Sequence, residues 1–181
     1  MEANKCTLFH SGLKGAEDYF GQVAEKYGVQ EVVYSYEGRT PHRARNVKVL
    51  TDDELKRGDI SMEIVSQMLN RKFYEADKIR KVLQIIFHMV NNGHQVFVIG
   101  TILDDNTVKG GTGWAVELAK LFNRPLHVFD QAKEKWFTWE KGAWKEERQP
   151  KIEYDSFVGS GTRYLEDSGK KAIDDLFKNS F

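Results

Sequence analysis

The segment from Lys109 to Gly113 (Lys-Gly-Gly-Thr-Gly) combines residue types that can hold an anion. It follows an apolar run, Val96 to Ile99, and precedes an amphipathic stretch from Trp114 to Phe122. Glycines let the backbone come close to a ligand, and the first N–H groups of a helix are unpaired and partly positive. We therefore expect a phosphate or carboxylate to bind here. A tight turn alone would also explain the glycines.

Two more glycine loops follow apolar runs. In chain order, Ser11 to Gly15 is the first glycine loop and follows residues 6 to 10, Lys109 to Gly113 is the second, and Gly159 to Arg163 is the third and follows residues 152 to 158. Arginine pairs with phosphate through two hydrogen bonds, although Arg163 has Glu166 and Asp167 as alternative partners. The predicted ligand-binding residues of the three loops are Ser11, Gly12, Gly15, Lys109, Gly110, Gly111, Thr112, Gly113, Trp114, Gly159, Ser160, Gly161, Thr162 and Arg163.

Strand and helix patterns alternate along the chain. Short apolar runs predict strands, and apolar residues at helical spacing predict helices. The expected strands are 6–10, 31–36, 47–50, 96–99, 126–129 and 152–158, and the expected helices are 16–27, 52–68 with a break at 58–59, 73–90, 114–122 and 169–177. Residues 135–145 predict a β-hairpin. This order favours an α/β, Rossmann-like, mainly parallel sheet with helices on both faces.

At 181 residues, the chain is expected to form one domain. Residues 52–92 are interpreted as a helical insertion that either lies across the binding crevice or forms a dimer interface. In a parallel sheet, the loops that follow the strands gather at one edge. The loops after residues 10, 100 and 158 should therefore meet, with Arg163, Lys109 and Arg71 at the rim of one pocket.

The central loop also resembles a known family motif. Gly110, Gly111, Gly113 and Glu117 match the P-G-G-x-G-T-x-x-E motif of the Lonely Guy family of nucleoside-monophosphate phosphoribohydrolases, with Lys109 in place of the proline and Trp114 in place of the threonine. Met68, Arg71 and Lys72 match the upstream M-H-x-R-K motif of that family. Residues 5 to 131 resemble most closely the putative molybdenum-cofactor carriers and the SLOG nucleotide sensors of the same superfamily.

The resemblance implies two functions. The first is binding of a nucleotide or nucleotide-derived small molecule, with Trp114 reshaping the pocket floor. The alternative is hydrolysis of an N-glycosidic bond, in which Glu117 stabilises the positive charge that develops on the sugar or orients water, and Arg71 holds the phosphate or assists the leaving base. The family also implies a homodimer or higher homo-oligomer.

Composition disfavours several other classes. Lys+Arg and Asp+Glu both number 27, so no global positive field favours nucleic acid, and this balance argues against a DNA-binding role like that of DNA-processing relatives. The single Cys6 forms no internal disulfide, and the five scattered histidines predict no metal site. The chain shows neither a signal peptide nor an apolar run of ~20 residues, which favours a cytoplasmic protein without a membrane span.

Two clusters of side chains, one basic and one of tryptophans, each allow more than one interpretation. The basic loop 37–47 carries Arg39, His42, Arg43 and Arg45, which either hold a phosphate or face solvent. The tryptophans Trp136, Trp139 and Trp144 either cover the sheet edge, form a dimer surface or stack on a base.

Overall fold

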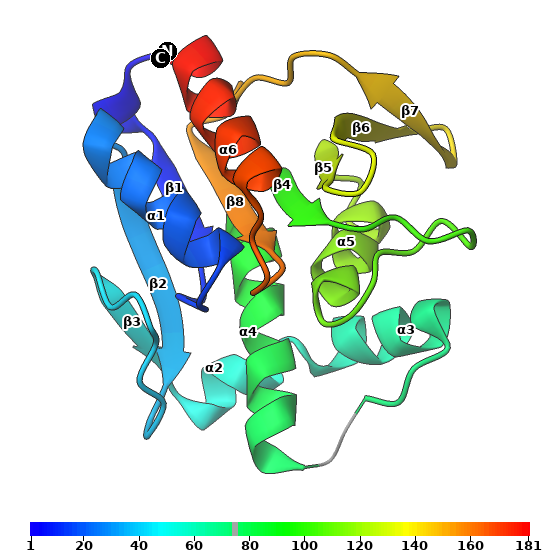
Figure 1. The fold of residues 1–181 in the computed structure, drawn as a ribbon. Coiled ribbons are helices and arrows are strands. Elements are labelled where there is room, and N and C mark those ends of the chain that lie inside the picture. The colour runs from blue at the N-terminus through cyan, green and yellow to red at the C-terminus, as the bar shows by residue number, and fades with distance from the viewer. Residues whose placement is uncertain (74–75) are drawn as a thin grey trace.

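In the computed structural model, which describes residues 1–73 and 76–181, an eight-stranded sheet has the order β3-β2-β1-β8-β4-β5-β6-β7 (Figure 1). All neighbouring strands from β3 to β5 pair in parallel, and β6 and β7 are antiparallel. The predicted α/β class, mainly parallel sheet and hairpin are confirmed. The strands are β1 Thr7–His10, β2 Gln30–Tyr36, β3 Val47–Leu50, β4 Gln95–Gly100, β5 Leu126–Asp130, β6 Lys135–Glu140, β7 Ala143–Glu147 and β8 Ser156–Gly161.

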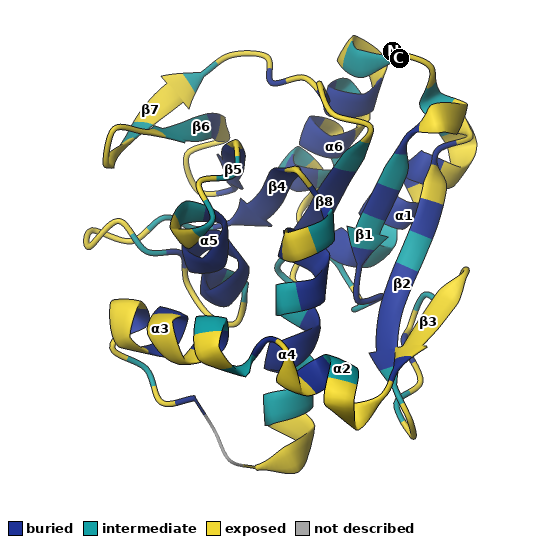
Figure 2. Ribbon diagram, turned by 180° about the vertical axis from the view of Figure 1, so that it is seen from behind, coloured by how far each residue is buried: buried dark blue, intermediate teal, exposed yellow. Residues whose placement is uncertain are grey.

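Helices cover both faces of the sheet, as predicted. Helices α1 (Ala16–Tyr27) and α6 (Asp167–Ser180) pack together on one face (Figure 1). Helices α3 (Asp59–Leu69), α4 (Asp77–Asn92) and α5 (Thr112–Leu121) form the layer on the other face, with the short α2 (Asp52–Lys56) beside α4 (Figure 2). A 3-10 turn, Ala3–Lys5, precedes β1. Each face therefore has its own apolar core.

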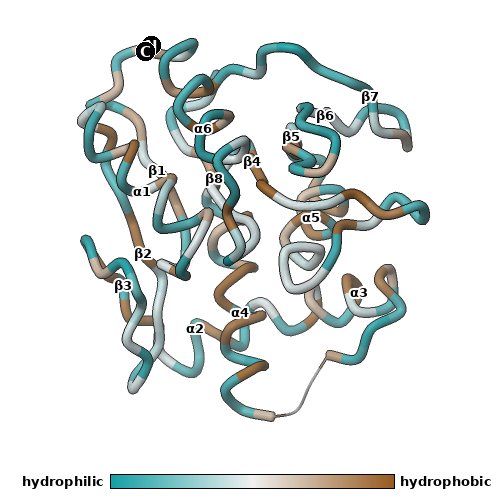
Figure 3. The backbone as a smooth tube through the Cα atoms, in the orientation of Figure 1, coloured by the Kyte–Doolittle hydropathy of each residue, from teal (hydrophilic) through white to brown (hydrophobic). Residues whose placement is uncertain are grey.

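Local sequence explains most element boundaries. Gly28 ends α1 in the left-handed conformation (φ 77°), which glycine adopts without a steric penalty. Thr51 and Glu54 form a reciprocal capping box at the start of α2. The inner strand β4 is buried along its whole length because helices cover both of its faces (Figure 2). In α4, apolar and polar segments alternate along the tube, as expected for a helix with one face on the core (Figure 3).

Residues 52–92 are a crossover connection. They carry the chain from β3, at the edge of the sheet, back to β4 in its centre, and α4 packs on β1, β2 and β8. The segment therefore builds one helical layer on the sheet, and its role in a dimer interface stays a prediction. The helix expected at 73–90 is α4, which begins only at Asp77, because Ala76 has a non-helical backbone (ψ 114°). Residues 74–75 of that prediction lie outside the described residues.

The tryptophans of the hairpin are packing residues. Trp136 is buried against Phe97 and Phe129. Trp139 and Trp144 contact each other edge to face, with ring centroids 5.0 Å apart, and the ammonium of Lys120 lies 3.9 Å from the Trp139 ring centroid. The interpretation that these residues cover the sheet edge is supported by these contacts.

Helix α3 carries an exposed apolar stripe. Ile60, Ile64 and Met68 follow one another at four-residue spacing, and Ile60 is 80% exposed. A surface of this kind is typical of regions that subunits bury, and the homo-oligomer stays a prediction. In the described part of the chain, no helix is long and apolar enough to cross a membrane.

Candidate functional site

A cavity of about 560 Å³ lies where the loops after four parallel strands meet. Its walls come from the loop after β1, the loop after β4, the residue after β5 and the loop after β8. The lining residues are Leu13, Lys14, Gly100, Thr101, Lys109, Gly110, Gly111, Thr112, Gln131, Gly161, Thr162, Arg163, Tyr164 and Glu166. The expected convergence of the three glycine loops is therefore found in the structure.

Half of the predicted ligand-binding residues line this cavity. They are Lys109, Gly110, Gly111, Thr112, Gly161, Thr162 and Arg163. The others lie beside or behind the wall: Ser11, Gly12, Gly15, Gly113, Trp114, Gly159 and Ser160. The other seven lining residues were not predicted. Among them are Lys14, in the loop after β1, and Gln131, the residue after β5, both at the sheet edge where the loops were expected to meet. A larger hollow of about 740 Å³, between α6 and residues 148–150, includes no part of the glycine loops.

The first and third glycine loops touch through their backbones. The N–H of Ala16 donates to the carbonyl of Thr162 at 2.9 Å, and the N–H of Thr162 donates to the carbonyl of Ile99 at 2.9 Å. Gly15 has φ 99°, and a Cβ there would lie 2.5 Å from the Thr162 oxygen. Only glycine fits this approach, so Gly15 joins the loops rather than lining the cavity.

Glu17 holds the same two loops together from behind. One carboxylate oxygen accepts from the Ser11 N–H at 2.9 Å, the Ser11 hydroxyl at 2.7 Å and the Leu13 N–H at 3.2 Å. The other accepts from the Ser160 hydroxyl at 3.1 Å. Glu17 is 3% exposed, so these buried donors depend on it. Ser11 and Ser160 therefore stabilise the wall of the cavity by donating to Glu17 and do not line the cavity themselves.

The second glycine loop opens helix α5. Gly110 has φ 74°, and its carbonyl accepts from Arg71 Nη1 at 2.6 Å. A Cβ on Gly110 or Gly111 would meet nothing within 4 Å, whereas one on Gly113 would collide with the Val108 carbonyl. Gly113 therefore packs the loop, and Gly111 presents open backbone to the cavity. Arg71 orients the loop from outside the lining.

The cavity is rich in positive charge. Lys14, Lys109 and Arg163 line it, with Glu166 as the carboxylate among the lining residues. Within residues 1–73 and 76–181, none of these three cations has a carboxylate within 4.0 Å. Asp167, considered as a partner of Arg163, pairs instead with Lys170. Cations of this kind, beside unpaired N–H groups at a helix start, favour an anion.

Three predicted loop residues belong to strand β8. The strand continues to Gly161, so it includes Gly159, Ser160 and Gly161, and the loop itself begins at Thr162. A Cβ on Gly159 would lie 2.6 Å from the Phe20 ring, so this glycine allows α1 to pack closely on the sheet. Gly12 likewise permits close packing, against Pro41 and Val33. These glycines are structural, which corrects their expected place in the lining.

The side chains of Glu117 and Trp114 contact other parts of the chain, away from the cavity lining. The Glu117 carboxylate accepts from Lys120 Nζ at 2.7 Å, and the pair is about nine-tenths buried. Lys120 also donates to the Asn106 carbonyl, as does Trp144 Nε1. Trp114 is buried against Phe73. Neither residue lines the cavity, and the catalytic roles predicted for Glu117 and Arg71 stay predictions.

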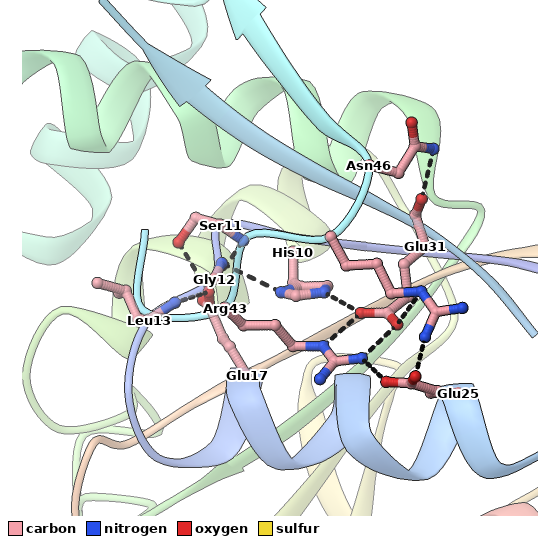
Figure 4. A network of polar contacts seen from close by, with 10 residues as sticks. His10, Ser11, Gly12, Leu13, Glu17, Glu25, Glu31, Arg43 and Asn46 are labelled. Carbon is pink, nitrogen blue, oxygen red and sulfur yellow. Dashed lines mark hydrogen bonds and ion pairs between the residues drawn. The ribbon is translucent and has the colours of Figure 1, made fainter. Parts of the chain in front are cut away.

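A buried polar network anchors the wall on the side of β2 (Figure 4). The Gly12 N–H donates to His10 Nδ1 at 3.1 Å, so the neutral ring carries its proton on Nε2, 3.1 Å from Glu31. Arg43 donates to both oxygens of Glu31, at 2.7 and 2.6 Å. The basic loop 37–46 is thereby tied to the first glycine loop.

Glu31 gives this network a pH dependence. Burial acts to raise the pKa of the Glu31 carboxyl, but hydrogen bonds from Arg43 and His10 outweigh it, and the pKa is lowered. The contribution of the Glu31 carboxylate to the free energy of unfolding is therefore complete above its unfolded pKa of ~4.3 and is lost as pH falls through its folded pKa.

We expect Glu31→Gln to lower the free energy of unfolding by about 3 kcal/mol at pH 7. In urea unfolding, the free energy of this variant should also decline less steeply as the pH is lowered.

The control for this prediction is Glu153→Gln, which makes the same change at an exposed position. Its pH profile of unfolding free energy should parallel that of the native chain. An unchanged acid slope in Glu31→Gln would show that Glu31 does not carry the linkage.

Within the described residues, no group of three or more histidine, cysteine, aspartate or glutamate side chains is placed to hold a metal ion. No protein-family model, curated protein or solved structure matches the chain. The resemblance to the SLOG and Lonely Guy superfamily therefore stays a prediction based on its motifs.

Proposed function

We propose that this protein binds a nucleotide or nucleotide-derived small molecule, with a phosphate held in the cavity between the three glycine loops. The observation that carries the proposal is the joint lining of one cavity by the start of α5 and by Lys14, Lys109 and Arg163, which lack carboxylate partners among the described residues. Backbone N–H groups and cations together are the usual means of holding phosphate in α/β folds.

The cavity also has room for more than a phosphate. A volume of about 560 Å³ lies within the range of small-molecule sites. Leu13 and Tyr164 add apolar and aromatic surface to the lining, and an aromatic ring can stack on a base. Gln131 adds an amide that can both donate and accept hydrogen bonds. These groups favour a ligand with a polar ring system attached to its phosphate.

The geometry favours binding over hydrolysis. Neither Glu117 nor Arg71 lines the cavity, and each is hydrogen-bonded to another residue of the chain. Hydrolysis through Glu117 requires that a bound nucleoside monophosphate be cleaved and that Glu117→Gln stop cleavage without weakening binding. The binding proposal requires that the nucleotide be recovered unchanged.

The proposal is tested by mass spectrometry of small molecules released from the purified protein, followed by thermal unfolding with a nucleotide panel. A ligand that binds only the folded state raises the melting temperature by mass action. We expect at least one nucleotide to stabilise the native chain, and Arg163→Gln to reduce the shift. If no nucleotide is released and none changes the melting temperature of the native chain, the proposal is wrong.

A further inference from the structure

The hollow between the glycine loops continues past Arg163. A second cavity of about 280 Å³ shares Leu13, Lys14 and Arg163 with the first. Its remaining lining comes from Arg39, Thr40, Pro41 and His42, in the loop between β2 and β3. The basic loop therefore borders the same hollow as the three glycine loops.

This loop is a fixed part of the wall. The Arg43 N–H donates to the Gly12 carbonyl at 3.1 Å, which joins the loop to the first glycine loop. The Ser35 hydroxyl donates to the Arg39 carbonyl at 3.0 Å, and Pro41 is buried. Together with the Arg43–Glu31 pair (Figure 4), these contacts hold residues 39–42 beside the cavity.

Arg39 differs from the other arginines of the loop. Arg43 and Arg45 both pair with Glu25, and Arg43 pairs with Glu31. Arg39 is half-buried, and its Nη1 donates to the Tyr34 carbonyl at 3.3 Å. No carboxylate of the described residues lies within 4.0 Å of Arg39.

Burying the positive charge of Arg39 costs free energy, and a bound anion would offset that cost. Burial lowers the pKa of the Arg39 guanidinium, and the negative charge of Glu17 opposes this only in part. A partly buried charge is stabilised by a partner of opposite sign and by filled hydrogen bonds. The guanidinium can give a phosphate or carboxylate two parallel hydrogen bonds. His42 lies at the rim of this cavity. Its Nε2 atom is 3.5 Å from a carboxylate oxygen of Asp18, so one of its ring nitrogens already has a partner.

We propose that the cavity beside Arg39 is a second anion subsite, so that the ligand carries two separate anionic groups. The first lies at the start of α5, the second lies beside Arg39, and Lys14 and Arg163 stand between them. The ligand class is a nucleotide with a second phosphate apart from the first, as in a nucleoside bisphosphate. This inference rests on the proposed function of the larger cavity.

The test is calorimetric titration with the 5′-monophosphates of adenosine and guanosine and with their 3′,5′-bisphosphates, at one ionic strength. We expect one bisphosphate to bind the native chain about tenfold more tightly than its monophosphate. Arg39→Gln should remove this preference and leave monophosphate affinity unchanged. Arg45→Gln, which removes a paired charge from the same loop, should keep it. His42→Asn, at the exposed rim, provides a second variant if Arg39→Gln does not fold, and it should reduce the preference.

The outcomes separate the two proposals. Equal binding of monophosphate and bisphosphate would overturn the second subsite and leave the proposed function standing. A preference that persists in Arg39→Gln and in His42→Asn would also overturn the subsite. If none of the four nucleotides binds, the subsite proposal is wrong, and the proposed function is decided separately by the released ligand and the wider nucleotide panel.

Discussion

Replacing Gly111 with valine is expected to weaken ligand binding about 100-fold while the chain stays folded. Gly111 lines the cavity with φ −61°, a conformation open to any residue, and a Cβ there meets no atom within 4 Å. A valine side chain therefore fits the free protein but occupies the space that a phosphate needs at the start of α5. Loss of two charge-assisted hydrogen bonds, at about 1.5 kcal/mol each, corresponds to about two powers of ten in affinity.

The matched control is Gly113→Ala. A Cβ at Gly113 would collide with the Val108 carbonyl and lie 3.3 Å from Arg71 Nη1, so this small change should disturb the loop itself. Gly111→Val should keep the melting temperature within a few degrees of the native chain, whereas Gly113→Ala should lower it. Native-like affinity in Gly111→Val would mean that the ligand does not occupy this part of the cavity.

Glu17→Ala is expected to remove about 3 kcal/mol from the free energy of unfolding and to abolish ligand binding. The substitution leaves the buried N–H groups of Ser11 and Leu13 without their acceptor, and each unsatisfied donor costs about 1–3 kcal/mol. It also frees the first glycine loop from Ser160 on β8. Urea unfolding measures the first effect and calorimetric titration the second.

Glu17→Gln should give an intermediate result, because an amide keeps one acceptor oxygen but brings two donors to a site that already holds donors. The control is Asp18→Asn on the same helix, which removes a surface charge but keeps an oxygen that can accept from Gln22, and it should change stability by less than about 0.5 kcal/mol. Equal stability of Glu17→Ala and Asp18→Asn would show that Glu17 does not hold the loops.

Features with a local cause could be predicted from the sequence. Apolar periodicity identified the strands and helices, and in the structure Gly28 and Thr51 end and begin helices through local backbone and side-chain contacts. The convergence of the loops followed from one rule about parallel strands. It needed no knowledge of the strand order, in which β8 lies between β1 and β4.

Features that depend on distant partners could not be predicted in this way. Glu17 contacts Ser160, which is 143 residues away, and nothing near Glu17 in the sequence indicates that contact. The role of Gly159 depends on Phe20 of α1. The surroundings of Glu117 depend on Lys120, which is itself covered by tryptophans of the hairpin. A motif therefore located the loop correctly but did not show which side chains face the cavity.

The central claim is that three loops hold one phosphate-bearing ligand. Amide chemical shifts of the isotope-labelled protein, recorded during titration with the best nucleotide of the panel, test it most directly. The claim predicts that Leu13, Gly111 and Thr162 shift together, with one dissociation constant. Shifts confined to a single loop, or to Ser168 and Leu176 beside the larger hollow at α6, would contradict it.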